Sequence, residues 1–247
     1  MLLENRTAIV TGAGSTAGIG HATARAFVEA GARVVLVDLD PDGVAEAAAA
    51  LGERAVGIAA DVRSAETSRH VFEHVRRTAG RLDILVNSAG ITQARRTLDI
   101  TPEDYEAVMS VNLGGTLVMI QQALPMMTAG GSIVCIASIA GQRGGGLMGG
   151  PHYAASKGGV SSLVKSVARE VAGEGIRVNS VNPGVIMSQM TRDFYDEANT
   201  QRVLPNIPLA RFGEPSEVAS VCLFLASDMA SYLTGTSIDV NGGMHMN

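Results

Sequence analysis

A tyrosine and a lysine lie four residues apart in the segment Tyr153-Ala154-Ala155-Ser156-Lys157. On a helix, this spacing places both side chains on one face, one turn apart. A free phenol has a pKa of about 10 and is a poor acid–base catalyst near neutral pH, but a nearby cation lowers that pKa. The pair could therefore act as a general acid or base. A surface Tyr/Lys pair without a chemical role has the same spacing, so other residues must supply the rest of a site.

A glycine-rich loop, Thr-Gly-Ala-Gly-Ser-Thr-Ala-Gly-Ile-Gly at residues 11–20, lies between an expected strand and an expected helix. Glycines there let the backbone approach a pyrophosphate, and the helix N-terminus supplies free N–H groups and a partial positive charge. A plain tight turn is the alternative, but a position after a strand and before a helix is the one that dinucleotide binding requires. The loop therefore predicts a dinucleotide cofactor.

Asp38 follows the second expected strand, near the spacing from the glycine loop at which a carboxylate accepts hydrogen bonds from an adenosine ribose. A carboxylate at this point repels a 2′-phosphate, and residues 12–20 contain no Arg or Lys to bind one. Both features favour NAD over NADP. The alternative is that Asp38 only begins the turn Asp38-Leu39-Asp40-Pro41.

Short β-branched runs alternate with longer alanine-rich segments of helical period along the chain. This rhythm predicts an α/β fold: a single Rossmann-type domain over residues 1–247, with a doubly wound parallel sheet of about seven strands and helices on both faces. Segment 186–212 is polar and long for a connection, which is typical of a substrate lid. The expected strands are 7–10, 33–37, 55–60, 83–86, 132–137, 176–181 and 237–240. The expected helices are 19–30, 44–51, 65–78, one from Pro102 towards Leu124, 152–171 and 216–226.

The composition limits the partners. With 46% apolar and 17% charged residues the chain is globular, and a net charge of −5 argues against nucleic acid or an anionic membrane surface. The chain has no signal-like N-terminus and no apolar run long enough to span a bilayer, so we expect a cytoplasmic protein without a membrane partner. Cys135 and Cys222 lie in apolar runs, which predicts buried thiols and neither a disulfide framework nor a metal site.

Taken together, these motifs resemble the short-chain dehydrogenase/reductase family over essentially the whole chain. Each piece alone is unspecific, but their joint order and separations are highly specific. The matching pieces are the loop from Gly12 to Gly20, Asn87-Ser88-Ala89-Gly90, Asn112, Ser138, Tyr153-x-x-x-Lys157 and Asn182-Pro183-Gly184.

The resemblance implies catalytic roles for four residues. Tyr153 would exchange a proton with the substrate oxygen, and Ser138 would hydrogen-bond that oxygen. Lys157 would bind the nicotinamide ribose and lower the pKa of Tyr153. Asn112 would lie in a disturbed part of its helix and help hold a water that relays protons to Lys157.

The same resemblance, with the loop and Asp38, implies the cofactor site. The implied cofactor-binding residues are Gly12, Gly14, Ser15, Gly18, Ile19, Gly20, Asp38, Asp61, Val62, Asn87, Ala89, Gly90, Tyr153, Lys157, Pro183, Gly184, Val185 and Ile186. The loop is about two residues longer than is usual in the family, so either Gly12 or Gly14 could take the role of its first glycine. Ser88 stands where many members have a second asparagine, and we expect no loss of binding from it.

The substrate is less constrained than the reaction. We expect NAD-dependent oxidation of a secondary hydroxyl, in an alcohol, a polyol or a sugar, with a mobile glycine-rich loop at 144–150 beside the substrate. Candidate contacts are Gln93, Arg95, Gln142, Arg143, His152, Met187 and Met190, although His152 could be a cap and the methionines packing. If Arg95 or Arg143 points inward, an anionic substrate becomes plausible.

Two alternatives and an assembly state complete the expectations. Segments 211–218 and 234–246 resemble 3-oxoacyl-[acyl-carrier-protein] reductases, but Asp38 disfavours the NADPH that those enzymes normally use. Segments 126–131 and 172–175 also lack the basic residues that would dock an acidic carrier. A non-catalytic dinucleotide sensor would not need the four catalytic residues together. The resemblance also implies a homotetramer in which two long helices pair across subunits.

Overall fold

The seven strands of the described chain form one parallel sheet in the order β3-β2-β1-β4-β5-β6-β7. A computed structural model describes residues 1–192 and 194–246, apart from the side chains of Gln189 and Met190. The strands are β1 Thr7–Thr11, β2 Arg33–Asp38, β3 Ala55–Ala59, β4 Ile84–Asn87, β5 Ser132–Ile136, β6 Arg177–Pro183 and β7 Ser237–Val240. This is the predicted fold class, and each expected strand is present within one or two residues of its expected ends.

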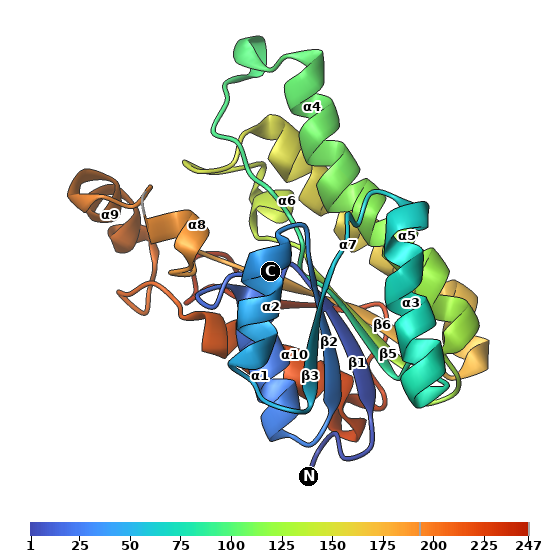
Figure 1. The fold of residues 1–247 in the computed structure, drawn as a ribbon. Coiled ribbons are helices and arrows are strands. Elements are labelled where there is room, and N and C mark those ends of the chain that lie inside the picture. Colours follow the sequence, from blue (N-terminus) through green and yellow to red (C-terminus); the bar gives the residue numbers. More distant parts are fainter. Residues whose placement is uncertain (193, 247) are drawn as a thin grey trace.

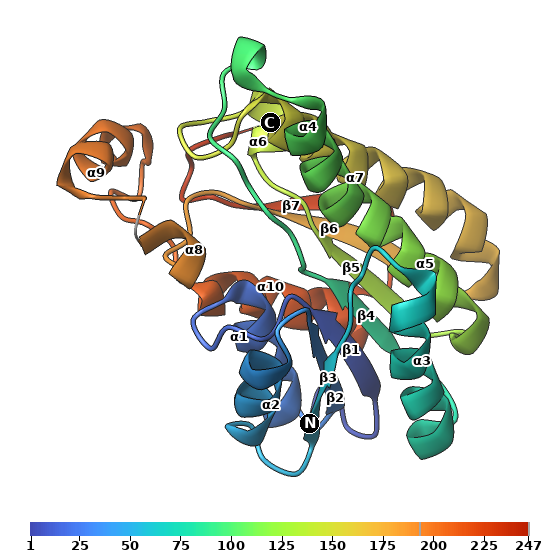
Figure 2. The ribbon, with the colours of Figure 1, turned by 45° about the horizontal axis from the view of Figure 1, so that its top comes forward.

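Helices cover both faces of the sheet, as Figures 1 and 2 show. One layer contains α1 Ile19–Glu29, α2 Pro41–Ala49 and α10 Pro215–Ala226. The other contains α3 Ala65–Ala79, α4 Pro102–Met109, α5 Thr116–Ala123 and α7 Pro151–Val171. Three short helices, α6 Ala140–Arg143, α8 Gln189–Arg192 and α9 Glu197–Val203, lie beyond the sheet edge at which the strands end.

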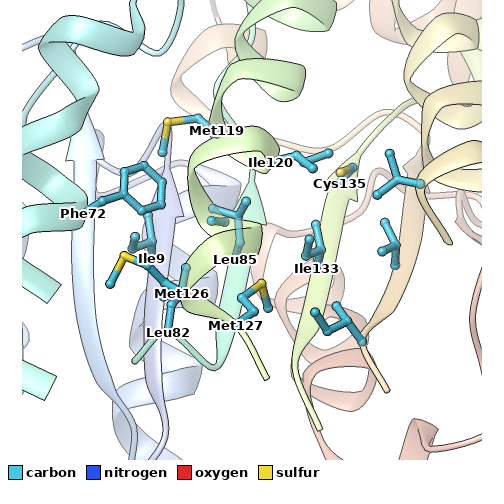
Figure 3. Packing of buried hydrophobic residues seen from close by; sticks show 14 of the residues in the cluster. Ile9, Phe72, Leu82, Leu85, Met119, Ile120, Met126, Met127, Ile133 and Cys135 are labelled. Atoms are coloured by element: carbon cyan, nitrogen blue, oxygen red, sulfur yellow. The ribbon is translucent and has the colours of Figure 1, made fainter. Parts of the chain in front are cut away.

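Each helix layer packs on the sheet through its own apolar core. Figure 3 shows part of the core beneath α3, α5 and α7, where Phe72, Met119 and Ile120 meet Ile9 and Leu85. The second core lies under α1, α2 and α10. Strands buried on both faces have no polar side to alternate with, which is why their sequences read as unbroken apolar runs.

Several helices differ from the expected ones for local reasons, and the helix disturbance expected around Asn112 is present. Helix α2 begins at Pro41, earlier than expected, because the Asp40 side chain accepts from the Asp42 N–H and Pro41 occupies the first turn. The helix expected from Pro102 is interrupted by a π-helical stretch, Ser110–Gly115, before α5 continues. Helices α6, α8 and α9 were not expected, because each is too short to show an apolar period.

The helical run Pro102–Met126 has the length and mean hydropathy of a membrane span, and it is the single run in the described residues that does. It is nevertheless a layer of the fold: its side chains Met119, Ile120 and Ala123 are fully buried against the sheet. Only 39% of its most apolar window is buried, so much of its outer face is apolar and uncovered within one chain.

The strand order creates a crevice between β1 and β4. From β1 the chain builds outward to β2 and β3, then returns to the other side of β1 with β4, β5, β6 and β7. The connections after β1 and β4 therefore leave the sheet in opposite directions. In open α/β sheets, ligands bind beyond the carboxyl ends of the strands at this point.

Candidate active site

A cleft of about 630 Å³ lies over the carboxyl ends of β1, β2, β4, β5 and β6. Its lining comes from the glycine loop after β1, from Asp38, from the segment after β4, from the segment between β5 and α7, and from residues 183–186. The same cleft thus includes the predicted cofactor loop and the predicted acid–base pair, which are far apart in sequence.

Ser138 and Tyr153 meet in this cleft. Ser138 follows the end of β5, and its Oγ accepts from the Ala140 N–H at 3.1 Å. Tyr153 lies in the first turn of α7, half-buried, and the Ser138 side chain is near enough to its phenol to lower its pKa as a hydrogen-bond partner. The two hydroxyl groups therefore converge on the position at which a substrate oxygen would have to bind.

Lys157 lies one turn further along α7 and is buried. Its Nζ donates to the carbonyl oxygen of Ile136, at the end of β5, at 2.7 Å. Burial lowers the pKa of this ammonium to about 8. An ammonium held by only one protein acceptor keeps donors for further partners, and Lys157 lines the cleft.

The pKa of Tyr153 does not shift in the expected direction. Burial raises it, and the hydrogen bond with Ser138 lowers it by a smaller amount. Lys157 is not among the groups that perturb the Tyr153 phenol in this structure. The sequence suggested that Lys157, one helical turn away, would lower the pKa of Tyr153. In this structure the ammonium of Lys157 is directed at the Ile136 carbonyl instead.

Asn112 lies in the π-helical stretch with its side chain fully buried. Its Oδ1 accepts from the Ile91 N–H at 2.9 Å, and its Nδ2 donates to the Ile91 carbonyl and to Ser156 Oγ. Both amide hydrogens are therefore used, while Oδ1 keeps one lone pair. The main-chain carbonyl of Asn112 accepts from Thr116 Oγ1 and also keeps a lone pair.

Ser156 is a positioning residue that the sequence did not single out. Its buried hydroxyl donates to the Tyr153 carbonyl at 2.7 Å and accepts from Asn112 Nδ2 at 2.9 Å. It thereby joins the π-helical stretch to the first turn of α7. Its position between Tyr153 and Lys157, on the side of α7 that faces the protein, could have indicated this role from the sequence.

Glycines allow the close approaches on which the site depends. A Cβ on Gly90 would lie 3.3 Å from Lys157 Nζ, and one on Gly149 would lie 2.4 Å from Cδ1 of the Tyr153 ring. A Cβ on Gly141 would lie 2.6 Å from the backbone N of Gly158, so α6 packs directly on the α7 backbone. Gly149 and Gly141 were missed, although the glycine-rich segment around them was noted.

The structure separates the roles of the loop glycines. Gly12 has φ +65°, which only glycine adopts easily, and a Cβ there would lie 2.7 Å from the Ala89 backbone. A Cβ on Gly20 would lie 2.3 Å from the Gly12 carbonyl oxygen. Gly12 therefore makes the tight turn after β1, and Gly20 allows α1 to pack against it.

The N-terminus of α1 is available to an anion. Its N-cap, Gly18, provides no side-chain hydrogen bond to the first turn, and Ser15, Gly18 and Ile19 line the cleft. Unsatisfied N–H groups and the helix dipole make such an end suitable for a pyrophosphate. The loop thus fits the dinucleotide that its sequence predicts.

Asp38 is held at the edge of the cleft by backbone donors. Its Oδ2 accepts from the Gly14 N–H and its Oδ1 from the Leu39 N–H, each at 2.8 Å. A Cβ on Gly14 would lie 2.8 Å from Asp38 Cγ. Gly14 therefore leaves room for the Asp38 carboxylate, and Gly12 makes the tight turn. Asp38 does start a turn, as the alternative interpretation held, but it also lines the cleft.

The other predicted cofactor residues fall into two groups. Gly90, Pro183, Gly184, Val185 and Ile186 line the cleft. Asp61, Val62, Asn87 and Ala89 do not. Asp61 is bound by Arg63, with Nη2 to Oδ2 at 2.6 Å, which lowers the Asp61 pKa. Asn87 is buried, and its Oδ1 has no hydrogen-bond partner among the described residues.

Thr11 is a further residue that the sequence did not suggest. It is buried at the end of β1, and its Oγ1 accepts from the Ser88 and Ala89 N–H groups at 3.0 and 3.1 Å. It thus ties the cofactor loop to the segment after β4. A threonine just before the first loop glycine was the available signal.

Most of the predicted substrate contacts lie elsewhere. Arg143 lines the cleft, whereas Gln93, Gln142 and Met187 are not part of the lining. Arg95 pairs with Asp104, Nε to Oδ2 at 3.4 Å. The buried His152 is bound through Nε2 to Gln93 Oε1 at 3.0 Å, neither capping a helix nor facing solvent. The side chain of Met190 lies outside the described part of the chain.

Residues that the sequence did not single out complete the lining beyond Tyr153. They are the lid side chains Thr191, Tyr195, Arg202, Val203 and Asn206, together with Met148 and Met244. None belongs to a recognisable motif, because a lid is specified by shape and not by spacing. In the described residues, no group of three or more His, Cys, Asp or Glu could hold a metal ion.

Comparisons with known proteins identify the family of the chain. A family model described as enoyl-(acyl carrier protein) reductase matches residues 12–245. An uncharacterised short-chain type dehydrogenase/reductase of Sinorhizobium fredii is 43% identical, and the 3-oxoacyl-[acyl-carrier-protein] reductase of Thermotoga maritima is 41% identical. Each match covers 99% of both chains.

A crystal structure of a short-chain dehydrogenase/reductase from Brucella melitensis, named glucose/ribitol dehydrogenase, superposes with a TM-score of 0.94. It is 40% identical and covers 100% of this chain and 99% of that one. The chain therefore belongs to the short-chain dehydrogenase/reductase family of oxidoreductases.

Replacing Lys157 should stabilise the fold while removing activity. Burial depresses its pKa from 10.5 to about 8, so the unfolded chain binds more protons between these values and stability rises with pH across that window. The cost of burying the charge is present in full below pH 8. We expect Lys157→Met to raise the free energy of unfolding at pH 7 by roughly 1–3 kcal/mol, with a gain that shrinks towards pH 10.5.

Urea denaturation across this pH range measures the gain. Lys165→Met is the matched control, because Lys165 is exposed on the same helix and is the only other lysine. We expect no pH-dependent gain from it. A Lys157→Met protein that is less stable than the parent at pH 7 would contradict the depressed pKa.

Proposed function

We propose that the protein is an NAD-dependent alcohol dehydrogenase of the short-chain family that acts on a secondary hydroxyl or the corresponding ketone. The observation that carries this proposal is the convergence of Ser138 and Tyr153 in a cleft that also contains the glycine loop, Asp38 and Lys157. The family membership supports the reaction class. The cofactor and the substrate are the parts that we propose.

In the proposed mechanism, the nicotinamide supplies hydride acceptance and donation when bound. Ser138 holds the substrate oxygen by a hydrogen bond. Tyr153 takes the hydroxyl proton as the alcohol becomes a ketone and returns a proton in the reverse direction. Lys157 would hold the ribose hydroxyls with donors that Ile136 leaves available, and its positive charge would favour the phenolate form of Tyr153.

NAD is the proposed cofactor because of Asp38. Its carboxylate is fixed by the Gly14 and Leu39 N–H groups, so it is placed to accept from ribose hydroxyls and to repel a phosphate. The glycine loop offers no cation to offset that repulsion.

A polyol or sugar is the proposed substrate class, and the relative named glucose/ribitol dehydrogenase supports it. A 3-oxoacyl-[acyl-carrier-protein] reductase is the second candidate, favoured by the identity to the Thermotoga maritima enzyme. Against it stand Asp38 and the absence of basic side chains in segments 126–131 and 172–175. A screen of secondary alcohols, polyols, aldoses and 3-oxoacyl thioesters, followed by NADH absorbance, separates the two.

Replacing the proposed acid–base residue tests the mechanism. We expect Tyr153→Phe to lower kcat by roughly 10²–10⁴-fold with any substrate that the screen identifies, because general acid–base catalysis contributes this much. Tyr195→Phe is the comparison, since Tyr195 also lines the cleft. A larger loss of kcat in Tyr195→Phe than in Tyr153→Phe would show that Tyr195, and not Tyr153, transfers the proton. Unchanged turnover in Tyr153→Phe would favour a different mechanism, and binding of NAD without any turnover would favour a sensor.

Replacing Asp38 tests the cofactor. We expect the parent enzyme to have a kcat/KM at least tenfold higher with NAD than with NADP. Asp38→Asn should reduce that ratio by roughly tenfold, which corresponds to about 1.4 kcal/mol, because it removes the like-charge repulsion of the 2′-phosphate. Asp42→Asn is the control, since Asp42 is an exposed carboxylate of the next turn that does not line the cleft. Equal efficiency of NAD and NADP in the parent would refute the proposal.

We also propose a homotetramer and a lid at 186–212. The lid contains α8 and α9 and supplies part of the cleft lining. The outer face of Pro102–Met126 is apolar and largely uncovered, as a helix that pairs across subunits would be. Light scattering should give the mass of four chains, and a monomer would contradict this assembly.

A further inference from the structure

Two arginines from distant parts of the chain line the cleft beyond the catalytic residues. Arg143 ends α6, only five positions after Ser138, and Arg202 lies on α9 in the lid. Both side chains are exposed at the cleft. Figure 2 shows α6 and α9 reaching beyond the sheet edge from different sides. Arg202 was not suggested by the sequence, because nothing in its local pattern links it to Arg143.

Neither guanidinium group forms an ion pair with a described residue. The contact that fixes Arg143 is a hydrogen bond from Nη1 to the Met244 carbonyl oxygen, 3.3 Å long. Some other arginines do form ion pairs, among them Arg63 with Asp61, Arg95 with Asp104 and Arg211 with Glu217. Arg143 and Arg202 therefore keep donors that an incoming group could use.

The cleft has no described carboxylate that could neutralise them. The single acidic residue in its described lining is Asp38, at the end of β2, whose oxygens accept from backbone N–H groups. An anion that enters the cleft beside either guanidinium group gains a favourable charge interaction. Guanidinium groups also match the oxygen geometry of carboxylates and phosphates.

We propose that the substrate carries a carboxylate or phosphate group, which Arg143 and Arg202 bind while its hydroxyl carbon lies at Ser138 and Tyr153. This inference rests on the proposed function and narrows its substrate to hydroxy acids, sugar acids or sugar phosphates. A neutral polyol would leave both arginines without a role. The cleft of about 630 Å³ must also hold the dinucleotide, so the substrate is small and its anionic end lies at the mouth.

Asn206 offers a further donor in the lid. It lines the cleft from the same segment as Arg202, and its Nδ2 donates one hydrogen bond to the Arg202 carbonyl oxygen at 3.0 Å and keeps a second hydrogen available. Because Arg143 lies on the fixed part of the fold and Arg202 on the lid, an anion bound by both would hold the lid against α6. Binding of the anionic group would then favour the closed arrangement that excludes water from the reacting atoms.

Paired substrates test this inference. We would measure kcat/KM, by NADH absorbance, for 3-hydroxybutanoate against its methyl ester, gluconate against glucitol, and glycerol 3-phosphate against glycerol. We expect the anionic member of the active pair to be preferred by at least about tenfold, as charge-assisted hydrogen bonds to the arginines would give. The first two pairs report a carboxylate, and the third reports a phosphate.

Substitution of the arginines then assigns the preference. Arg143→Gln and Arg202→Gln should each raise KM for the anionic member by about tenfold more than KM for the neutral member, and the double variant should abolish the preference. Arg95→Gln and Arg192→Gln are matched controls, because these arginines lie on the neighbouring loop and on the lid but do not line the cleft. Circular dichroism of each variant would verify folding.

The outcomes separate this inference from the proposed function. Preference for the neutral members, or a preference for the anion that survives in the double variant, would overturn the inference and leave the dehydrogenase intact. Turnover of no alcohol with NAD, here or in the wider screen, would count against both.

Discussion

The ammonium group of Lys157 lies beneath the cleft with the Ile136 carbonyl oxygen as its acceptor at 2.7 Å. This contact sets the distance between α7 and the end of β5, and therefore the position of Tyr153 relative to Ser138. It also carries a cost, because burial depresses the pKa of Lys157 to about 8. A protein that needed only stability would not keep a cation there. Gly90 leaves room for the ammonium, because a Cβ at this position would lie 3.3 Å from Lys157 Nζ and 3.2 Å from Asn112 Oδ1.

Glycines allow backbone segments around the site to pack in direct contact. Gly141 lets α6 pack on the α7 backbone, and Gly149 lets the preceding loop pack on the Tyr153 ring. In the cofactor half, Gly20 lets α1 pack against the Gly12 carbonyl, while Thr11 joins that loop to the segment after β4. The two halves of the cleft are thus built in the same way, with a glycine wherever a side chain would separate two pieces of backbone that must touch.

This construction explains what could be predicted from the sequence. The strands, the long helices and the order of the motifs were predictable, because buried parallel strands and amphipathic helices leave a period in the sequence. The pieces of the reacting centre were found because Tyr153, Lys157 and the glycine loop are local patterns. Arg202, Tyr195 and Ser156 were not found, since their roles depend on where separate segments meet. The pKa of Tyr153 was expected to fall because its sequence neighbour is a cation, but the direction of the Lys157 side chain and the burial of the phenol decide it.

Charge is distributed unevenly along the cleft, and this asymmetry bears on how the two ligands bind. Asp38 is the carboxylate of the described lining, and Arg143 and Arg202 are cations from the segments beyond Ser138. In the arrangement that we propose, a dinucleotide with free ribose hydroxyls would meet the carboxylate, and a substrate anion would meet the arginines. Exchanging the two ligands would place the substrate anion against Asp38 and leave both guanidinium groups without it. The charges that would select each ligand would therefore also orient it in the cleft.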